Sequence, residues 1–157
     1  MRIHPPTTRR APPTVSSQRS IRFPADVAHL ASVRDFARDA AAALGAAVDA
    51  NDLAVVVGEL AANAAVHQTG EAQLTVALVE GGLQVEVRDA DASVPGIVHG
   101  DAWDTEGHRG LFLVDALSRA WGVEPLERGK RVWAVLAVAD ASDRDDHHGG
   151  DRMAGRR

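Results

Sequence analysis

The spacing of hydrophobic and polar positions changes several times along the chain, and two stretches have the period of a helix. Behind Asp26, which can cap a helix, apolar residues recur at helical spacing until Gly45 can end the element. The second stretch begins after Asn51–Asp52 and keeps the same period to about Gln68. The pattern therefore predicts two helices in the first half of the chain.

Other stretches alternate between apolar and polar residues, as half-buried strands do. The segment "SIRFP" (20–24) predicts a short strand, and "AQLTVALVE" (72–80) with "LQVEVRD" (83–89) predicts a hairpin turning at Gly81–Gly82. A helix over "GLFLVDALSRA" (110–120) precedes a second hairpin, "WGVEPLE" and "KRVWAVLAV", which turns at Arg128–Gly129. Because consecutive hairpins pair antiparallel, this order predicts an α+β fold: a two-layer α/β sandwich with a mostly antiparallel sheet and its helices on one face.

Three stretches lack any period. Residues 90–109 predict a loop of unusual length for a compact domain, which is typical of a lid or a binding loop. Residues 1–18 and 140–157 are polar and rich in Pro, Ser or Gly, so we expect disordered tails around one domain at 19–139. We interpret His147 and His148, in the second tail, as solvated residues rather than metal ligands.

The amino-acid composition excludes several classes of protein. The 157 residues are 45% hydrophobic and 25% charged, which is ordinary for a globular domain. No apolar run approaches the ~20 residues that span a bilayer, so no membrane association is expected. The absence of cysteine excludes disulfides and thiolate metal sites and is consistent with a cytoplasmic protein. Residues 19–139 hold 10 basic and 17 acidic residues, and this balance of −7 argues against general nucleic-acid binding, which needs clustered Lys and Arg.

The predicted helix in "VVVGELAANAAVHQTG" (55–70) carries a polar stripe. Glu59, Asn63 and His67 are four residues apart, so they stack on one face about 6 Å apart along the axis. The stripe could be an ordinary solvent-exposed face. Its neighbours, however, are small and the helix has no basic residue, so a carboxylate and a carboxamide could hold a hydrated Mg²⁺. Glu59 could also accept a proton from a nucleophile.

Two further features could belong to a site. Asp89 ends a predicted strand where the long loop begins, and it is either a turn residue or an acceptor for an exocyclic amine such as that of adenine. In "EGHRGLFLVDAL" (106–117), Gly107 and Gly110 flank His108–Arg109 directly before a predicted helix. These residues either cap that helix or bring backbone amides and a guanidinium to a phosphate.

Together, "GELAANAAVH", "VEVRDADASVP" and "GHRGLFLVDALSRAWGV…GKRVWAVL" resemble the histidine-kinase-like ATPase domain (the Bergerat fold) over about residues 20–138. The resemblance is to the stand-alone form found in anti-sigma factor serine/threonine kinases of actinobacteria. It implies that ATP and Mg²⁺ bind between helices and sheet under a lid. It also implies roles for the residues singled out above: Glu59 as base, Asn63 as Mg²⁺ ligand, Asp89 as adenine acceptor, His67 in support, and Gly107, His108, Arg109, Gly110 and Leu111 beside the phosphates.

The resemblance further implies partners. An anti-sigma kinase phosphorylates a serine or threonine of an anti-anti-sigma (STAS-type) protein, sequesters a sigma factor, or does both, and relatives commonly form homodimers. Relatives usually read Gly-Arg-Gly-Leu where this chain reads "GHRGL", so His108 takes the place of the first glycine. A side chain there would crowd the phosphates if that position needs close backbone approach. The alternatives are therefore a non-catalytic nucleotide-binding or protein-binding module and, third, an ATP hydrolase.

Overall fold

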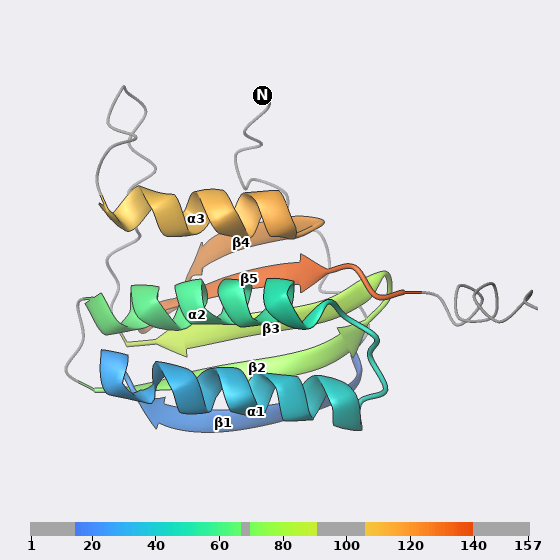
Figure 1. Ribbon diagram of the computed structural model, residues 1–157. Coiled ribbons are helices and arrows are strands. Elements are labelled where there is room, and N and C mark those ends of the chain that lie inside the picture. Colours follow the sequence, from blue (N-terminus) through green and yellow to red (C-terminus); the bar gives the residue numbers. More distant parts are fainter. Residues whose placement is uncertain (1–14, 67–69, 91–105, 140–157) are drawn as a thin grey trace, which may run out of the picture.

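The computed structural model describes residues 15–66, 70–90 and 106–139, and Figure 1 shows its two layers. Five strands form one sheet, and the helices lie over one of its faces (Figure 1). In chain order the elements are β1 (Val15–Pro24), a short 3-10 helix η1 (Val27–His29), α1 (Leu30–Ala43), α2 (Ala50–Val66), β2 (Glu71–Val79), β3 (Gly82–Asp89), α3 (Glu106–Leu117), β4 (Ala120–Pro125) and β5 (Lys130–Leu136). The predicted α+β sandwich is confirmed.

The strand order is β1-β2-β3-β5-β4, and every neighbouring pair is antiparallel. The last strand of the chain, β5, lies between β3 and β4, so the second hairpin joins the first through β3 and β5. The chain thereby brings the end of β3 beside the start of β5, although the two are far apart in sequence. The pairing of β3 with β5 therefore places Asp89, one of the predicted site residues, beside Lys130.

The core lies between the sheet and the helices. Alternate strand residues point into it, and α1 and α2 contribute the buried side of each helix, as the alternating pattern requires. The fully buried aliphatic side chains include Val33, Leu53, Val56, Val57, Leu60, Leu74, Val76, Leu83, Val85, Val87, Val114, Val132 and Leu136. Because α2 packs against α1, α3, β3 and β5, it is the central helix of the layer.

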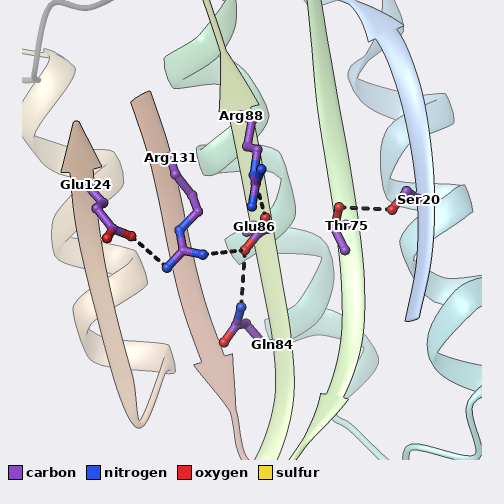
Figure 2. Close-up of polar contacts among 7 residues, drawn as sticks. All are labelled: Ser20, Thr75, Gln84, Glu86, Arg88, Glu124 and Arg131. Carbon is purple, nitrogen blue, oxygen red and sulfur yellow. Dashed lines mark hydrogen bonds and ion pairs between the residues drawn. The ribbon is translucent and has the colours of Figure 1, made fainter. Parts of the chain in front are cut away.

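The other face of the sheet carries a polar network that Figure 2 shows on the side away from the helices. Glu86 is 6% exposed and accepts hydrogen bonds from Arg88 Nε (2.9 Å), Gln84 Nε2 (3.2 Å) and Arg131 (3.3 Å). Arg131 also forms an ion pair of 2.7 Å with Glu124. The network therefore ties β3, β5 and β4 together by side chains as well as by their backbones.

The first strand starts earlier than the sequence predicted. β1 begins at Val15, so residues 15–18, which composition assigned to a disordered tail, belong to the sheet. Their side chains are exposed, but Gln18 pairs with Ala77 and Ser17 with Leu78 across β2. Backbone pairing at a sheet edge needs no buried side chain, so composition could not reveal it. Residues 1–14 and 140–157, and hence His147 and His148, lie outside the described residues.

The residues that cap the helices also differ from those that the sequence predicted. Asp26 makes no capping hydrogen bond through its side chain; its Oδ1 instead accepts one of 2.7 Å from His29 Nδ1, which lowers the pKa of Asp26. The cap of α2 is Asp49, whose Oδ1 accepts hydrogen bonds of 2.9 Å from the amides of Asn51 and Asp52. The side chain of Asp49 thereby satisfies two amides of the first turn of α2.

The last helix also begins earlier than predicted. α3 starts at Glu106, so the glycine-containing segment lies within the helix and not before it. Within this segment Gly110 packs against Glu59 of α2, and this contact favours the helical conformation despite the low helix propensity of glycine. Within the described part of the chain, no helix is long and apolar enough to cross a membrane.

Candidate functional site

The polar stripe of α2 turns toward α3 rather than into open solvent. Glu59 and Asn63 lie one turn apart, and both are half-buried, whereas the fully buried residues of the helix face the sheet and α1. His67, the third residue predicted for this stripe, lies outside the described residues. The stripe is therefore in part a contact surface between two helices.

The contact itself is between Glu59 and Gly110. A Cβ built on Gly110 would overlap Glu59 Oε2 and would come within 3.2 Å of Glu59 Cδ. The bare Cα of Gly110 thus forms the cradle in which the carboxylate lies. This contact joins two of the segments that the sequence singled out, although about fifty residues separate them.

The amide nitrogen of Asn63 has no hydrogen-bond partner in the part of the chain that the structure describes. This atom, Nδ2, is also buried. A buried donor left without an acceptor costs about 1–3 kcal/mol, so a ligand offering an acceptor oxygen would relieve this cost. The oxygens of a phosphate are such acceptors, and the carboxamide oxygen of the same side chain is of the type that binds Mg²⁺.

These residues fit a nucleotide better than a protein-only metal site. The described residues contain no group of three or more His, Cys, Asp or Glu side chains that could hold a metal ion. A Mg²⁺ held by Asn63 would therefore take its other ligands from phosphate oxygens and water, as Mg²⁺ commonly does. The site thus combines the carboxylate of Glu59 with the carboxamide of Asn63. The bare Cα of Gly110 lets the carboxylate come close to α3.

Asp89 lies at the end of β3 and is not a solvated turn residue. It is 6% exposed, and its Oδ2 is 3.3 Å from Nζ of Lys130, which is 2% exposed. Lys130 is not among the site residues predicted from the sequence. The alternation of β5 could have indicated that Lys130 is buried, because residues 130, 132, 134 and 136 share the face that the core occupies.

A shallow cavity of about 270 Å³ lies at the same end of the sheet. Its lining includes Asp89, Ala90, Arg22, Arg88 and Arg128, but neither Glu59 nor Asn63. The cavity therefore touches the end of β3 without outlining a nucleotide pocket under α2. Residues 91–105, which follow this end of β3 in sequence, are outside the described part of the chain.

The remaining predicted phosphate-binding residues lie early in α3. The backbones of Gly107, His108 and Arg109 are helical, and nothing is described of the side chains of the last two. Leu111 is buried, with 8% of its surface exposed. Gly110 is thus a member of this segment that contacts Glu59 of α2.

Comparison with known proteins supplies the family. The model of the histidine kinase-like ATPase domain matches residues 23–136, from the end of β1 to the end of β5. No match was found among curated proteins. The matched range contains every described site residue and most of the chain. The chain therefore belongs to the histidine kinase-like ATPase domain family, whose members bind ATP.

Proposed function

We propose that this protein is an ATP-dependent protein kinase of the anti-sigma factor type. In this proposal it transfers the γ-phosphoryl group of Mg·ATP to a serine or threonine of an anti-anti-sigma (STAS-type) partner. Sequestration of a sigma factor is the second activity that we propose for the same module. The family membership supports ATP binding, and the residues of α2 and α3 support the transfer.

The observation that carries the proposal is the position of the Glu59 carboxylate. It rests against Gly110 in α3, and it lies one turn of α2 from the buried amide of Asn63, for which the described residues supply no acceptor. A carboxylate held beside an unsatisfied donor suits a reaction in which a hydroxyl loses a proton next to a phosphate. A solvated helix face would require neither the bare glycine nor the buried amide.

The chemistry of the residues follows from these positions. Glu59 accepts the proton of the acceptor hydroxyl as its oxygen bonds to the γ-phosphorus, while the bond from that phosphorus to the bridging oxygen breaks and ADP leaves. Asn63 would hold the Mg²⁺ through its carboxamide oxygen or donate from Nδ2 to a phosphate oxygen, and Gly110 keeps room for the Glu59 carboxylate. Bound Mg·ATP supplies the phosphoryl group and the positive charge that offsets its oxygens.

The test is transfer of labelled phosphate from ATP to candidate STAS-type partners. Glu59→Gln keeps the shape of the side chain but cannot accept the proton, so transfer is expected to fall about 100-fold or more while Mg·ATP still binds. Glu80→Gln is the matched control, because Glu80 is exposed in the turn after β2 and its substitution should leave both properties unchanged. Transfer at the wild-type rate by Glu59→Gln would refute the role of this residue.

One feature favours a second candidate, a regulator that binds nucleotide or partner without transferring phosphate. His108 stands where relatives usually carry a glycine. The two candidates separate on the wild-type protein. Binding of Mg·ATP and of a STAS-type partner with no phosphorylation of its serines or threonines would support the second candidate. Consumption of ATP without any protein acceptor would instead indicate a hydrolase.

A further inference from the structure

We propose that the shallow cavity at the end of the sheet is an anion-binding site, in which Arg22, Arg88 and Arg128 hold a phosphate group. A phosphorylated side chain of a partner protein and inorganic phosphate both carry this group. The site is separate from the one on α2, because neither Glu59 nor Asn63 lines the cavity. The inference therefore depends neither on ATP binding nor on phosphotransfer.

The register of the sheet brings two of these arginines to the cavity. Arg22 of β1 pairs with Gln73 of β2, and Gln73 pairs in turn with Arg88 of β3. Directly paired residues point to the same face of a sheet, so the three lie in one row on the face away from the helices, where Figure 2 shows Arg88. Neighbouring strands are about 4.8 Å apart, so the backbones of the two arginines are about 10 Å apart, on either side of Gln73. All three residues line the cavity.

The third arginine comes from the turn between β4 and β5. The amide of Leu126 donates a hydrogen bond of 3.0 Å to the carbonyl oxygen of Gly129, which closes the turn that contains Arg128. A Cβ on Gly129 would overlap the carbonyl oxygen of Asp89, so the backbone of this turn packs directly on the end of β3. This packing places Arg128 at the cavity from a third segment of the chain.

The three guanidinium groups keep donors for a ligand. Within the described part of the chain, Arg128 forms no ion pair, and Arg88 donates to Glu86 through Nε. The two terminal nitrogens of Arg88 therefore have no acceptor among the described residues. The ion pair of Arg22 with Glu71 is 3.3 Å long, with 74% and 59% of the two side chains exposed. Such a pair contributes little to stability, so an anion can replace its carboxylate.

Stability alone explains an arginine at position 88 poorly. Arg88 lies directly opposite Arg131 in the register of β3 and β5, and like charges in this position destabilise a sheet. Glu86 offsets the repulsion by pairing with both guanidinium groups. A threonine or valine at position 88 would avoid the repulsion and would favour the strand. A ligand that needs the positive charge accounts for the arginine.

The charges that line the cavity match a phosphate better than a carboxylate. The three arginines contribute +3 and Glu71 contributes −1, while Asp89, which also borders the cavity, is paired with Lys130. The sum is +2, and a phosphate group on a side chain carries about −1.5 to −2 at pH 7. Its three terminal oxygens can accept from several guanidinium forks, whereas a carboxylate has one charge and two oxygens.

The test is NMR titration of the full chain with three small probes at pH 7.5: N-acetyl-O-phosphoserine amide, N-acetyl-aspartate amide and inorganic phosphate. Saturating Mg·ADP is present throughout, so that phosphate binding beside α2 does not contribute. The wild type is expected to bind the phosphoserine probe about tenfold more tightly than the aspartate probe, because only the phosphate engages more than one arginine.

The variants locate the binding site. Arg128→Gln and Arg22→Gln are each expected to weaken binding of the phosphoserine probe about tenfold, as the loss of a hydrogen bond to a charged group does. Both side chains are exposed, so the variants should fold. Arg19→Gln is the matched control: it removes the same charge from β1, but Arg19 pairs with the buried Val76 and so lies on the other face of the sheet. This control should bind the probe within about twofold of wild type.

The two phosphate probes separate the two sources of the ligand. Tighter binding of the phosphoserine probe indicates a phosphorylated side chain, and equal or tighter binding of inorganic phosphate indicates free phosphate. Three outcomes would overturn the proposal: neither phosphate probe binds, the aspartate probe binds as tightly as the phosphoserine probe, or Arg22→Gln and Arg128→Gln lose no more affinity than Arg19→Gln. Failure of the Glu59→Gln experiment leaves the inference intact, because no arm measures phosphotransfer.

Discussion

Two glycines with left-handed backbones allow the packing at the end of β3 to be measured apart from backbone strain. Gly45 (φ +72) follows α1, and Gly129 (φ +81) lies in the β4–β5 turn. Alanine in this conformation costs about 1–2 kcal/mol at either position. At Gly45 a Cβ would meet nothing within 4 Å, so the loss should stop there.

At Gly129 a second cost is added. The new Cβ would overlap the carbonyl oxygen of Asp89 and lie 2.8 Å from Cα of Ala90, and backbone atoms cannot turn aside as a flexible side chain can. Overpacking of this kind costs typically about 1–3 kcal/mol. Gly129→Ala is therefore expected to lower the free energy of unfolding by about 2–5 kcal/mol, against about 1–2 kcal/mol for Gly45→Ala.

Urea denaturation of both variants measures the difference. The expected result is a lower midpoint for Gly129→Ala at an unchanged slope, which means a change in stability and not in the surface exposed on unfolding. Equal losses of stability in the two variants would refute the proposed contact between the turn and β3.

Two further predictions concern the opposite face of the sheet and the contact between α2 and α3. Glu86→Gln keeps the shape of the side chain but removes the negative charge that Arg88 and Arg131 share. The free energy of unfolding, measured by urea denaturation, is expected to fall by about 1–3 kcal/mol. A fall below about 0.5 kcal/mol would contradict a stabilising network. Gly110→Ala should leave stability within about 1 kcal/mol of wild type, because alanine favours the helix and the overlapping atom ends a flexible side chain. Phosphotransfer by the same variant should fall about 100-fold, since the Glu59 carboxylate is displaced; unchanged transfer would contradict the cradle.

The candidate site was only partly readable from spacing. The separation of Glu59 and Asn63 showed that they share a helix face, and the end of a strand singled out Asp89. Spacing could not show that Gly110 receives the carboxylate, because the partners belong to helices that meet only after the sheet has formed. Nor could it show Lys130, which looks like one more charged residue next to a turn.

Periodicity by itself determined the fold class, most helices and strands, and the antiparallel hairpins, because burial of one face imposes a period of 2 or 3.6 on any strand or helix. It misplaced the start of β1, where exposed residues pair through their backbones, and the start of α3, where packing overrides the low helix propensity of glycine. Only the tertiary structure decided which polar residues meet. The pairing of β3 with β5 places a carboxylate beside a lysine, and the packing of α2 on α3 places another against a glycine. Such contacts depend on distances between elements, which no local pattern of residues encodes.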